Sequence, residues 1–494
     1  MSWLAVTRSA RARGTVGNAG YAVRGGPVTR AIETDYLVIG AGACGMSFTD
    51  ALIDADHECD VVMVDRRHAP GGHWNDAYPF VRLHQPAACY GVNSRPLGSG
   101  GIDSDGLNAG LYQQADGVEV CDYFRRVMDE HHLPSGQVRF FPMANYLGID
   151  GSDTAFVAAL TGATTEVRIR RAVVDARYLE GTVPSRHAPS FRVHPDARCV
   201  PVNDLVDIDE PAAGYTVIGG GKTASDACAW LLENGVDPER IRWIRARDPW
   251  MWNRAQVQPL ELVTDTIEGV SRGVEASAEA EGVDDLFARL EACGLLLRLD
   301  PAVSPTMYHG ATLTVAEVEL LGTIENVVRL GHVTAIGPKE IVLERGSVAT
   351  ERGGLYVDCS AAGLSKAPAR PIFEPGRITL QCISTVFPTF NAAVIGYLEA
   401  SRRDDQVAKA RLSPTNRYPD AARDWIPNMR GQLESLRLWN DEPDVAAWLE
   451  SSRLNIARGM LAKAAEPRMG EAITRLLTYS EAAVVNLDRL QAAP

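Results

Sequence analysis

The sequence predicts an α/β protein with two Rossmann-like dinucleotide-binding domains, the second inserted in a discontinuous first, and a helical C-terminal region. Two β-rich runs each end in a glycine-rich turn that opens a helix, near residues 35–53 and 215–233. The length of 494 residues also corresponds to about three structural units at roughly 150 residues each.

The first unit begins with the β run 35–39, which ends at a glycine turn, Gly40-Ala41-Gly42-Ala43-Cys44-Gly45. A helix-like stretch follows over 46–53, and a second β run over 60–64 ends at Asp65. This order of strand, turn, helix and strand within about thirty residues is typical of a βαβ unit.

The geometry of a dinucleotide site explains each residue type in this motif. Gly40 permits the tight turn, Gly42 lets the backbone approach a pyrophosphate, and Gly45 allows the helix to pack closely on the strand. The helix start then offers free N–H groups and a positive dipole end to the phosphates. Asp65 stands where a carboxylate accepts hydrogen bonds from ribose hydroxyls. The pattern therefore predicts a dinucleotide site and not a chance glycine loop.

The second unit repeats the pattern with a β run over 215–218, a turn from Gly219 to Ala224, a helix and a strand over 241–244. Its Gly-Lys-Thr triplet also suggests a phosphate-loop NTPase. That loop requires a glycine five residues before Gly221, and Thr216 occupies the position. A second dinucleotide site is favoured, with contacts from Gly219, Gly221, Lys222, Thr223 and Ala224.

The end of the second strand of this unit carries Arg245 and Arg247 where the first unit carries Asp65. Arginine at this place accommodates a 2′-phosphate, which favours NADP over NAD. The alternative is that these arginines only decorate a strand end. Two facing nucleotides in one chain indicate hydride transfer from a nicotinamide to a flavin.

Together with Gly71-Gly72-His73-Trp74 after Asp65, the two motifs resemble the class B flavin-dependent monooxygenases, which include the flavin-containing and Baeyer–Villiger enzymes. The run from Val357 to Gly363 resembles the late strand where such chains re-enter the FAD domain. Lys222 and Thr223 stand where Asn and Ser are more usual. The Phe-x-Gly-x-x-x-His fingerprint of that family has no good counterpart between 178 and 205.

The resemblance implies that the first motif binds FAD, that the Gly-Gly-x-Trp segment lies along it, and that the second motif binds NADPH. The residues so implied for FAD are Gly40, Gly42, Cys44, Gly45, Asp65, Arg66, Gly72 and Trp74. It further implies a monooxygenase that inserts one oxygen atom of O2 into a small organic substrate through a flavin C4a-hydroperoxide. The alternatives are an NAD(P)H-dependent reductase or dehydrogenase without oxygen transfer, and a regulatory flavoprotein without turnover.

Three residues are candidates for catalysis or flavin contact. Asn93 lies in the stretch that in the resembling family passes near the reactive flavin edge, and His84 is a candidate proton carrier. A loop asparagine that satisfies its own backbone and a structural histidine are the alternatives. Asn391 is expected to cap a helix from about Ala392, whose positive end would stabilise a reduced flavin.

Composition divides the chain further. The first 33 residues hold five Arg and one acid, which indicates a disordered extension or, alternatively, a transit peptide. The remaining predicted divisions are the FAD domain at 34–210 and 346–405, the NADP domain at 211–345 with a helical insertion near 257–298, and the helical region 406–494.

Charge and cysteine usage exclude several classes. The net charge of −14 argues against nucleic acid and anionic membranes as partners, and no apolar run is long enough to span a bilayer. The nine cysteines form no CxxC pair, which excludes dithiol redox chemistry and favours reduced thiols in the cytoplasm. The histidines show no ligand spacing, so no metal is predicted. Association into a homo-oligomer stays open.

Overall fold

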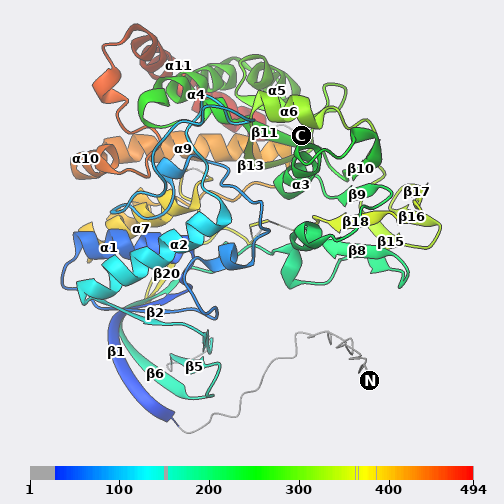
Figure 1. The fold of residues 1–494 in the computed structure, drawn as a ribbon. Helices are drawn as coiled ribbons and strands as arrows, with labels where there is room; N and C mark the ends of the chain where they lie inside the picture. Colours follow the sequence, from blue (N-terminus) through cyan, green and yellow to red (C-terminus); the bar gives the residue numbers. More distant parts are fainter. Residues whose placement is uncertain (1–27, 149–153, 362, 365–366, 385, 493–494) are drawn as a thin grey trace, which may run out of the picture.

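The computed structural model describes residues 28–148, 154–361, 363–364, 367–384 and 386–492. Four sheets and a group of helices make up this part of the chain (Figure 1). No helix within the described residues is both long enough and apolar enough to cross a lipid bilayer.

The first sheet contains the first glycine motif and runs in the order β19-β20-β6-β1-β2-β3. β1 (Val28–Ile39) pairs in parallel with β2 (Val61–Val64) on one side and with β6 (Thr164–Asp175) on the other. The other strands are β3 (Val138–Phe141), β4 (Ala144–Tyr146), β5 (Ala155–Ala158), β19 (Phe373–Glu374) and β20 (Arg377–Thr379). The expected extension is therefore shorter than predicted, because residues 28–33 belong to β1. Residues 1–27 lie outside the described part.

Helices cover the first sheet at the end where the glycine turn lies. α1 (Ala43–Ala55) follows the turn and packs against α7 (Pro388–Ser401), and α2 (Gly117–Val127) lies nearby (Figure 1). The two long helices approach so closely that a Cβ on Gly396 would lie 2.4 Å from the carbonyl oxygen of Phe48. Residues near 390 and near 45 are thereby held together at the same edge of the sheet.

The second sheet contains the second glycine motif and is parallel throughout its described strands, in the order β14-β10-β9-β18-β8. α3 (Lys222–Glu233) follows β9. The strands are β8 (Arg198–Pro201), β9 (Tyr215–Ile218), β10 (Ile241–Ile244), β14 (Val327–Val328) and β18 (Leu355–Asp358). In both sheets the glycine turn leaves a strand that has neighbours on both sides, which is the switch point where α/β sheets bind ligands.

The strand β18 differs from the sequence-based expectation. The run from Val357 was expected where the chain returns to the first sheet, but β18 pairs with β9 and β8 inside the second sheet. Among the described strands, the chain rejoins the first sheet at β19 and β20, and β20 pairs with β6. The sequence pattern of a fully buried strand identifies the strand but not the sheet that it joins.

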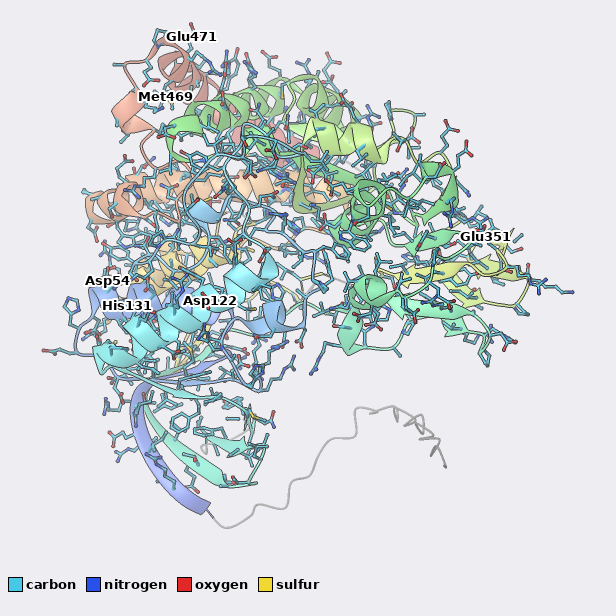
Figure 2. The ribbon with its side chains drawn as sticks, viewed as in Figure 1. Asp54, Asp122, His131, Glu351, Met469 and Glu471 are labelled. Atoms are coloured by element: carbon cyan, nitrogen blue, oxygen red, sulfur yellow. The ribbon has the colours of Figure 1, made fainter. Side chains whose placement is uncertain are left out.

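Two smaller sheets flank the second one. One has the order β12-β11-β13 and the other β17-β16-β15-β7. Their strands are β7 (Arg192–Val193), β11 (Pro249–Asn253), β12 (Leu296–Arg298), β13 (Met307–Leu313), β15 (Val333–Ile336), β16 (Glu340–Leu343) and β17 (Gly346–Ala349). Figure 2 shows Glu351, which follows β17, on the side of the molecule that carries β15–β17.

The predicted helical regions are helical. α4 (Val263–Glu279) and α5 (Val283–Ala292) fall within the expected insertion, and α6 (Val315–Leu321) follows β13. The C-terminal helices are α8 (Gln406–Leu412), α9 (Trp425–Asn440), α10 (Pro443–Ser451) and α11 (Pro467–Ala492). A shared apolar core joins the insertion to α9 and α11, in which Trp250 stacks on Phe287. Met469 and Glu471 mark the beginning of α11 in Figure 2.

Candidate functional site

The first glycine turn has the close packing that its sequence predicts. Gly40 adopts a φ of 106°, which favours glycine. A Cβ on Gly45 would lie 2.0 Å from the carbonyl oxygen of Gly40, so a larger residue cannot fit there. α1 begins after Gly42 without a side-chain cap. Its first N–H groups therefore have no capping side chain to satisfy them, as a phosphate site requires.

Asp65 is buried at the end of β2 and holds the backbone around this turn. Its Oδ2 accepts a 2.7 Å hydrogen bond from the N–H of Ala41, and its Oδ1 accepts one of 2.7 Å from the N–H of Arg67. The carboxylate therefore orders the glycine turn. The neighbouring Arg66 is half-exposed and pairs with Glu180.

The Gly-Gly-x-Trp segment lies directly on the first glycine turn. The N–H of Gly71 donates to the carbonyl of Ala41 at 2.9 Å, and a Cβ on Gly72 would lie 2.8 Å from the Cα of Gly42. Cys44 lies in the first turn of α1, and desolvation by the surrounding protein raises the pKa of its thiol to about 12. A thiol with this pKa is mostly protonated at neutral pH.

A cavity of about 530 Å³ begins at this segment and extends to the second glycine motif. His73 and Trp74 line one part of the cavity, and the turn from Gly219 to Thr223 lines another. The indole N–H of Trp74 donates to the Tyr90 hydroxyl at 2.8 Å, which fixes the ring. Phe387 and Pro388, at the start of α7, also face the cavity.

The second glycine turn is open on its ligand side. Nothing lies within 4 Å of a Cβ built on Gly221, whereas one built on Gly220 would lie 2.3 Å from the carbonyl oxygen of Arg247. α3 begins after Gly221 without a side-chain cap. Ala224 is fully buried beneath the turn, and Thr223 lines the cavity. The second glycine turn is thus packed against the protein at Gly220 and Ala224 and accessible at Gly221 and Thr223.

Lys222 lies on the cavity wall within a buried ionic network. Its Nζ pairs with Asp226 one turn along α3 and lies 3.6 Å from Glu317. Glu317 also lies 2.7 Å from the fully buried guanidinium of Arg254. Burial favours the neutral form of Glu317, but Lys222 and Arg254 outweigh it and lower the pKa of this carboxyl.

The two arginines predicted for the 2′-phosphate lie in different places. Arg247 lines the cavity, and its Nη2 lies 2.9 Å from Asp420. Arg245 is only 3 % exposed, lies over the Trp243 ring, and pairs with Asp248 at 3.1 Å. Burial lowers the pKa of Arg245. Because it is buried in this cluster and is not among the cavity-lining residues, we assign it a structural role, in place of the predicted phosphate contact.

His84 lines the cavity as expected of a site residue. Its side chain is exposed to the cavity, but the surrounding protein, followed by the charges of Lys222 and Arg254, lowers its pKa to about 3. His73, on the neighbouring wall, has a pKa lowered to about 4, first by the surrounding protein and then by the charge of Arg67. Both rings are neutral at physiological pH and can donate or accept one hydrogen bond without adding charge.

Asn93 makes a structural contact and is not among the residues that line the cavity. Its Oδ1 accepts a 2.8 Å hydrogen bond from Ser452 at the end of α10. The bond ties the loop after β2 to the C-terminal region. The proposed contact between Asn93 and a flavin is thus not supported by its position, because the sequence alone does not show which loop residues face inward.

Asn391 lies inside α7 and does not cap a helix that begins near Ala392. The helix begins at Pro388, and Asn391 Oδ1 accepts hydrogen bonds from the N–H groups of Ile383 and Ser384. Proline suits the first position of a helix, which explains the earlier start. The residue therefore stabilises the segment before α7, and the N-terminus of α7 still faces the cavity.

Three further residues on the cavity side stand in segments without a sequence motif and were not predicted. His309 and Tyr418 line the cavity, and Asp420 lies behind them at 2.9 Å from His309 Nε2. Tyr418 donates to the carbonyl of His309 at 2.7 Å. Only the pairing of the chain near Ala421 with β13 brings these residues together, and no local sequence signal records that pairing.

Both motifs fit a dinucleotide. Each opens a helix without a side-chain cap, and the second leaves open space above Gly221 where a phosphate would approach the backbone. The described residues contain no group of three or more potential ligand side chains placed to hold a metal ion.

This fold and site define an α/β protein with two Rossmann-like sheets and a cavity that reaches from the Gly-Gly-x-Trp segment to the second glycine motif. The chain belongs to the family of the "Uncharacterized protein Rv2000" of Mycobacterium tuberculosis (strain ATCC 25618 / H37Rv). The two are 44% identical over 449 residues, which cover 90% of this chain and 82% of the relative. The "Uncharacterized protein Mb2023" of Mycobacterium bovis shows the same identity and coverage. No protein-family model matches the chain.

The chain is similar to solved structures of monooxygenases. A steroid monooxygenase bound to NADP has a TM-score of 0.46 and 14% identity, and covers 75% of this chain and 86% of its own. An open form of cyclohexanone monooxygenase has a TM-score of 0.43 and 15% identity, and covers 74% of this chain and 88% of its own.

Proposed function

We propose that the chain is an FAD- and NADPH-dependent oxidoreductase, and that it acts as a monooxygenase on a small organic substrate. The observation that carries the proposal is the single cavity that joins the Gly-Gly-x-Trp segment to the second glycine motif. Because that segment lies on the first glycine turn, a flavin and a nicotinamide bound at the two motifs would meet in this space.

When bound, FAD supplies the redox chemistry, and the residues of the chain hold and shield the reacting groups. The turn at Gly40–Gly45 and Asp65 would hold the FAD end of the site, and the turn at Gly219–Thr223 would hold the nicotinamide nucleotide. The start of α7 directs its positive dipole end toward the cavity, where it favours negative charge. His84 and His73 provide neutral hydrogen-bonding groups beside it.

The experiment is a stepwise reduction and reoxidation of the purified protein. We expect bound FAD in the isolated protein, and bleaching of its absorbance by NADPH without oxygen. A product screen under 18O2 with mass spectrometry should then find one labelled oxygen atom in an organic product. Reduction by NADPH with an organic product that forms equally without oxygen would indicate a reductase or dehydrogenase instead. Failure of NADPH and NADH to bleach the flavin would contradict the whole proposal.

A further inference from the structure

The wall of the cavity beside Arg247 comes from the C-terminal region. The chain near Ala421 forms a β-bridge with Met307 of β13, and the N–H of Tyr308 donates to the carbonyl of Asp420 at 3.0 Å. The N–H of Asp420 itself donates to Asp424 at 2.8 Å. Two backbone hydrogen bonds therefore fix the position of Asp420, independently of its side chain.

The carboxylate of Asp420 contacts two side chains that line the cavity. Its Oδ1 lies 2.9 Å from Arg247 Nη2 and 2.9 Å from His309 Nε2. Arg247 stands three residues after β10, and its carbonyl oxygen lies against Gly220 in the second glycine turn. In this fold that position is next to the adenosine ribose, where the 2′-phosphate of NADPH and the 2′-hydroxyl of NADH differ.

Other cations around this strand end are also matched by carboxylates. Arg245 pairs with Asp248, and Arg329 pairs with Asp248 at 3.0 Å and with Asp300 at 2.7 Å. Asp420 thus neutralises the Arg247 guanidinium, which lines the cavity. The arginines around this strand end therefore carry little positive charge that is not already paired with a carboxylate. A guanidinium that is already paired with a fixed carboxylate adds less to the binding affinity of a 2′-phosphate than an unpaired guanidinium does.

We propose that Asp420 sets the nicotinamide-cofactor preference of this chain. By pairing with Arg247, Asp420 lowers the affinity of the site for the 2′-phosphate. It therefore reduces the difference in binding affinity between NADPH and NADH. The inference rests on the proposed function, because it assumes that a nicotinamide nucleotide binds at the second glycine motif. Asp420 belongs to the C-terminal region, in which no sequence motif was found.

The test compares two probes that differ only in the 2′-phosphate, adenosine 5′-monophosphate and adenosine 2′,5′-bisphosphate. Their dissociation constants are measured by titration calorimetry on the holoenzyme and on Asp420→Asn. The amide keeps the size of the side chain and an oxygen that accepts from Arg247, but removes the charge. We expect the preference for the bisphosphate to rise on the order of tenfold, a typical effect of one nearby charge. The ratio of KM values for NADH and NADPH should rise in parallel.

Asp441→Asn is the matched control, because it removes one exposed carboxylate from the same region at the end of α9. This control variant should leave the preference for the bisphosphate over the monophosphate unchanged, which would exclude a general effect of net charge. Asp420→Ser provides a second variant should the amide fold poorly. An unchanged or smaller preference for the bisphosphate in the folded Asp420 variants overturns the inference. If neither probe nor NADPH binds the unmodified protein, the proposed nicotinamide site itself fails.

Discussion

The hydroxyl of Tyr78 donates a 2.6 Å hydrogen bond to Oδ2 of Asp226 and thereby links the two halves of the site. Tyr78 follows the Gly-Gly-x-Trp segment by a few residues, and Asp226 stands in the first turns of α3. The other oxygen of Asp226 pairs with Lys222. Burial and the neighbouring Asp226 raise the pKa of Tyr78 well above its usual value, so the hydroxyl remains the donor.

Removal of this hydroxyl should weaken the connection between the two motifs. We expect Tyr78→Phe to lower the free energy of unfolding by about 1 kcal/mol, the usual net contribution of a buried hydrogen bond. Urea denaturation provides the measurement. Tyr215→Phe serves as the control, because Tyr215 in β9 is buried to a similar extent. Equal stability of the unmodified protein and Tyr78→Phe would contradict a stabilising role for the bond.

The two glycine turns should respond differently to alanine. Gly45→Ala places a methyl group against the carbonyl of Gly40, and we expect a loss of about 3 kcal/mol in stability together with loss of FAD. Gly221→Ala meets no protein atom within 4 Å and should fold with nearly unchanged stability. Its methyl group points where a phosphate would approach, so binding of NADPH should be lost.

Thermal unfolding and nucleotide titration separate these two effects. Normal NADPH binding by a folded Gly221→Ala protein would show that no phosphate lies above this glycine.

The buried pair of Arg254 and Glu317 should be costly to break from one side. We expect Arg254→Met to lower the free energy of unfolding by about 3–5 kcal/mol, because it removes the fully buried partner of a carboxylate. The double variant with Glu317→Gln should recover part of this loss. Chemical denaturation of the single and double variants gives the coupling energy, and simple additivity would indicate that the pair does not interact.

The neutral His84 ring should make the protein less stable in mild acid. Its folded-state pKa of about 3 lies below the ordinary imidazole value of about 6.5. As the pH falls below about 6.5, the unfolded chain binds a proton that the folded chain does not, so the stability falls. The contribution of His84 to the free energy of unfolding decreases further until the pH reaches about 3.

We therefore expect the free energy of unfolding of His84→Gln to decrease less steeply from pH 7 to pH 5 than that of the unmodified protein. His187→Gln, at an exposed histidine, is the control. Parallel pH profiles for all three proteins would show that the folded chain does not hold His84 neutral.

The amino-acid sequence by itself determined both glycine turns and the elements around them. Gly45 and Gly221 are recognisable because a tight turn, a helix start and a phosphate approach are local requirements on a few consecutive residues. The helical insertion and the helical C-terminal region follow from composition in the same way. The order of strand and helix also indicated two Rossmann-like sheets.

Only the tertiary structure decided which side chains meet between these elements. Arg245 and Arg247 are two residues apart, yet one is buried beside Trp243 and the other lines the cavity. Asn93 bonds to Ser452, and Arg247 pairs with Asp420, across 359 and 173 residues. Such contacts depend on how separate elements pack, and packing leaves no fixed spacing in the sequence. The sequence thus predicted where nucleotides would bind, and the fold showed which residues surround these two places.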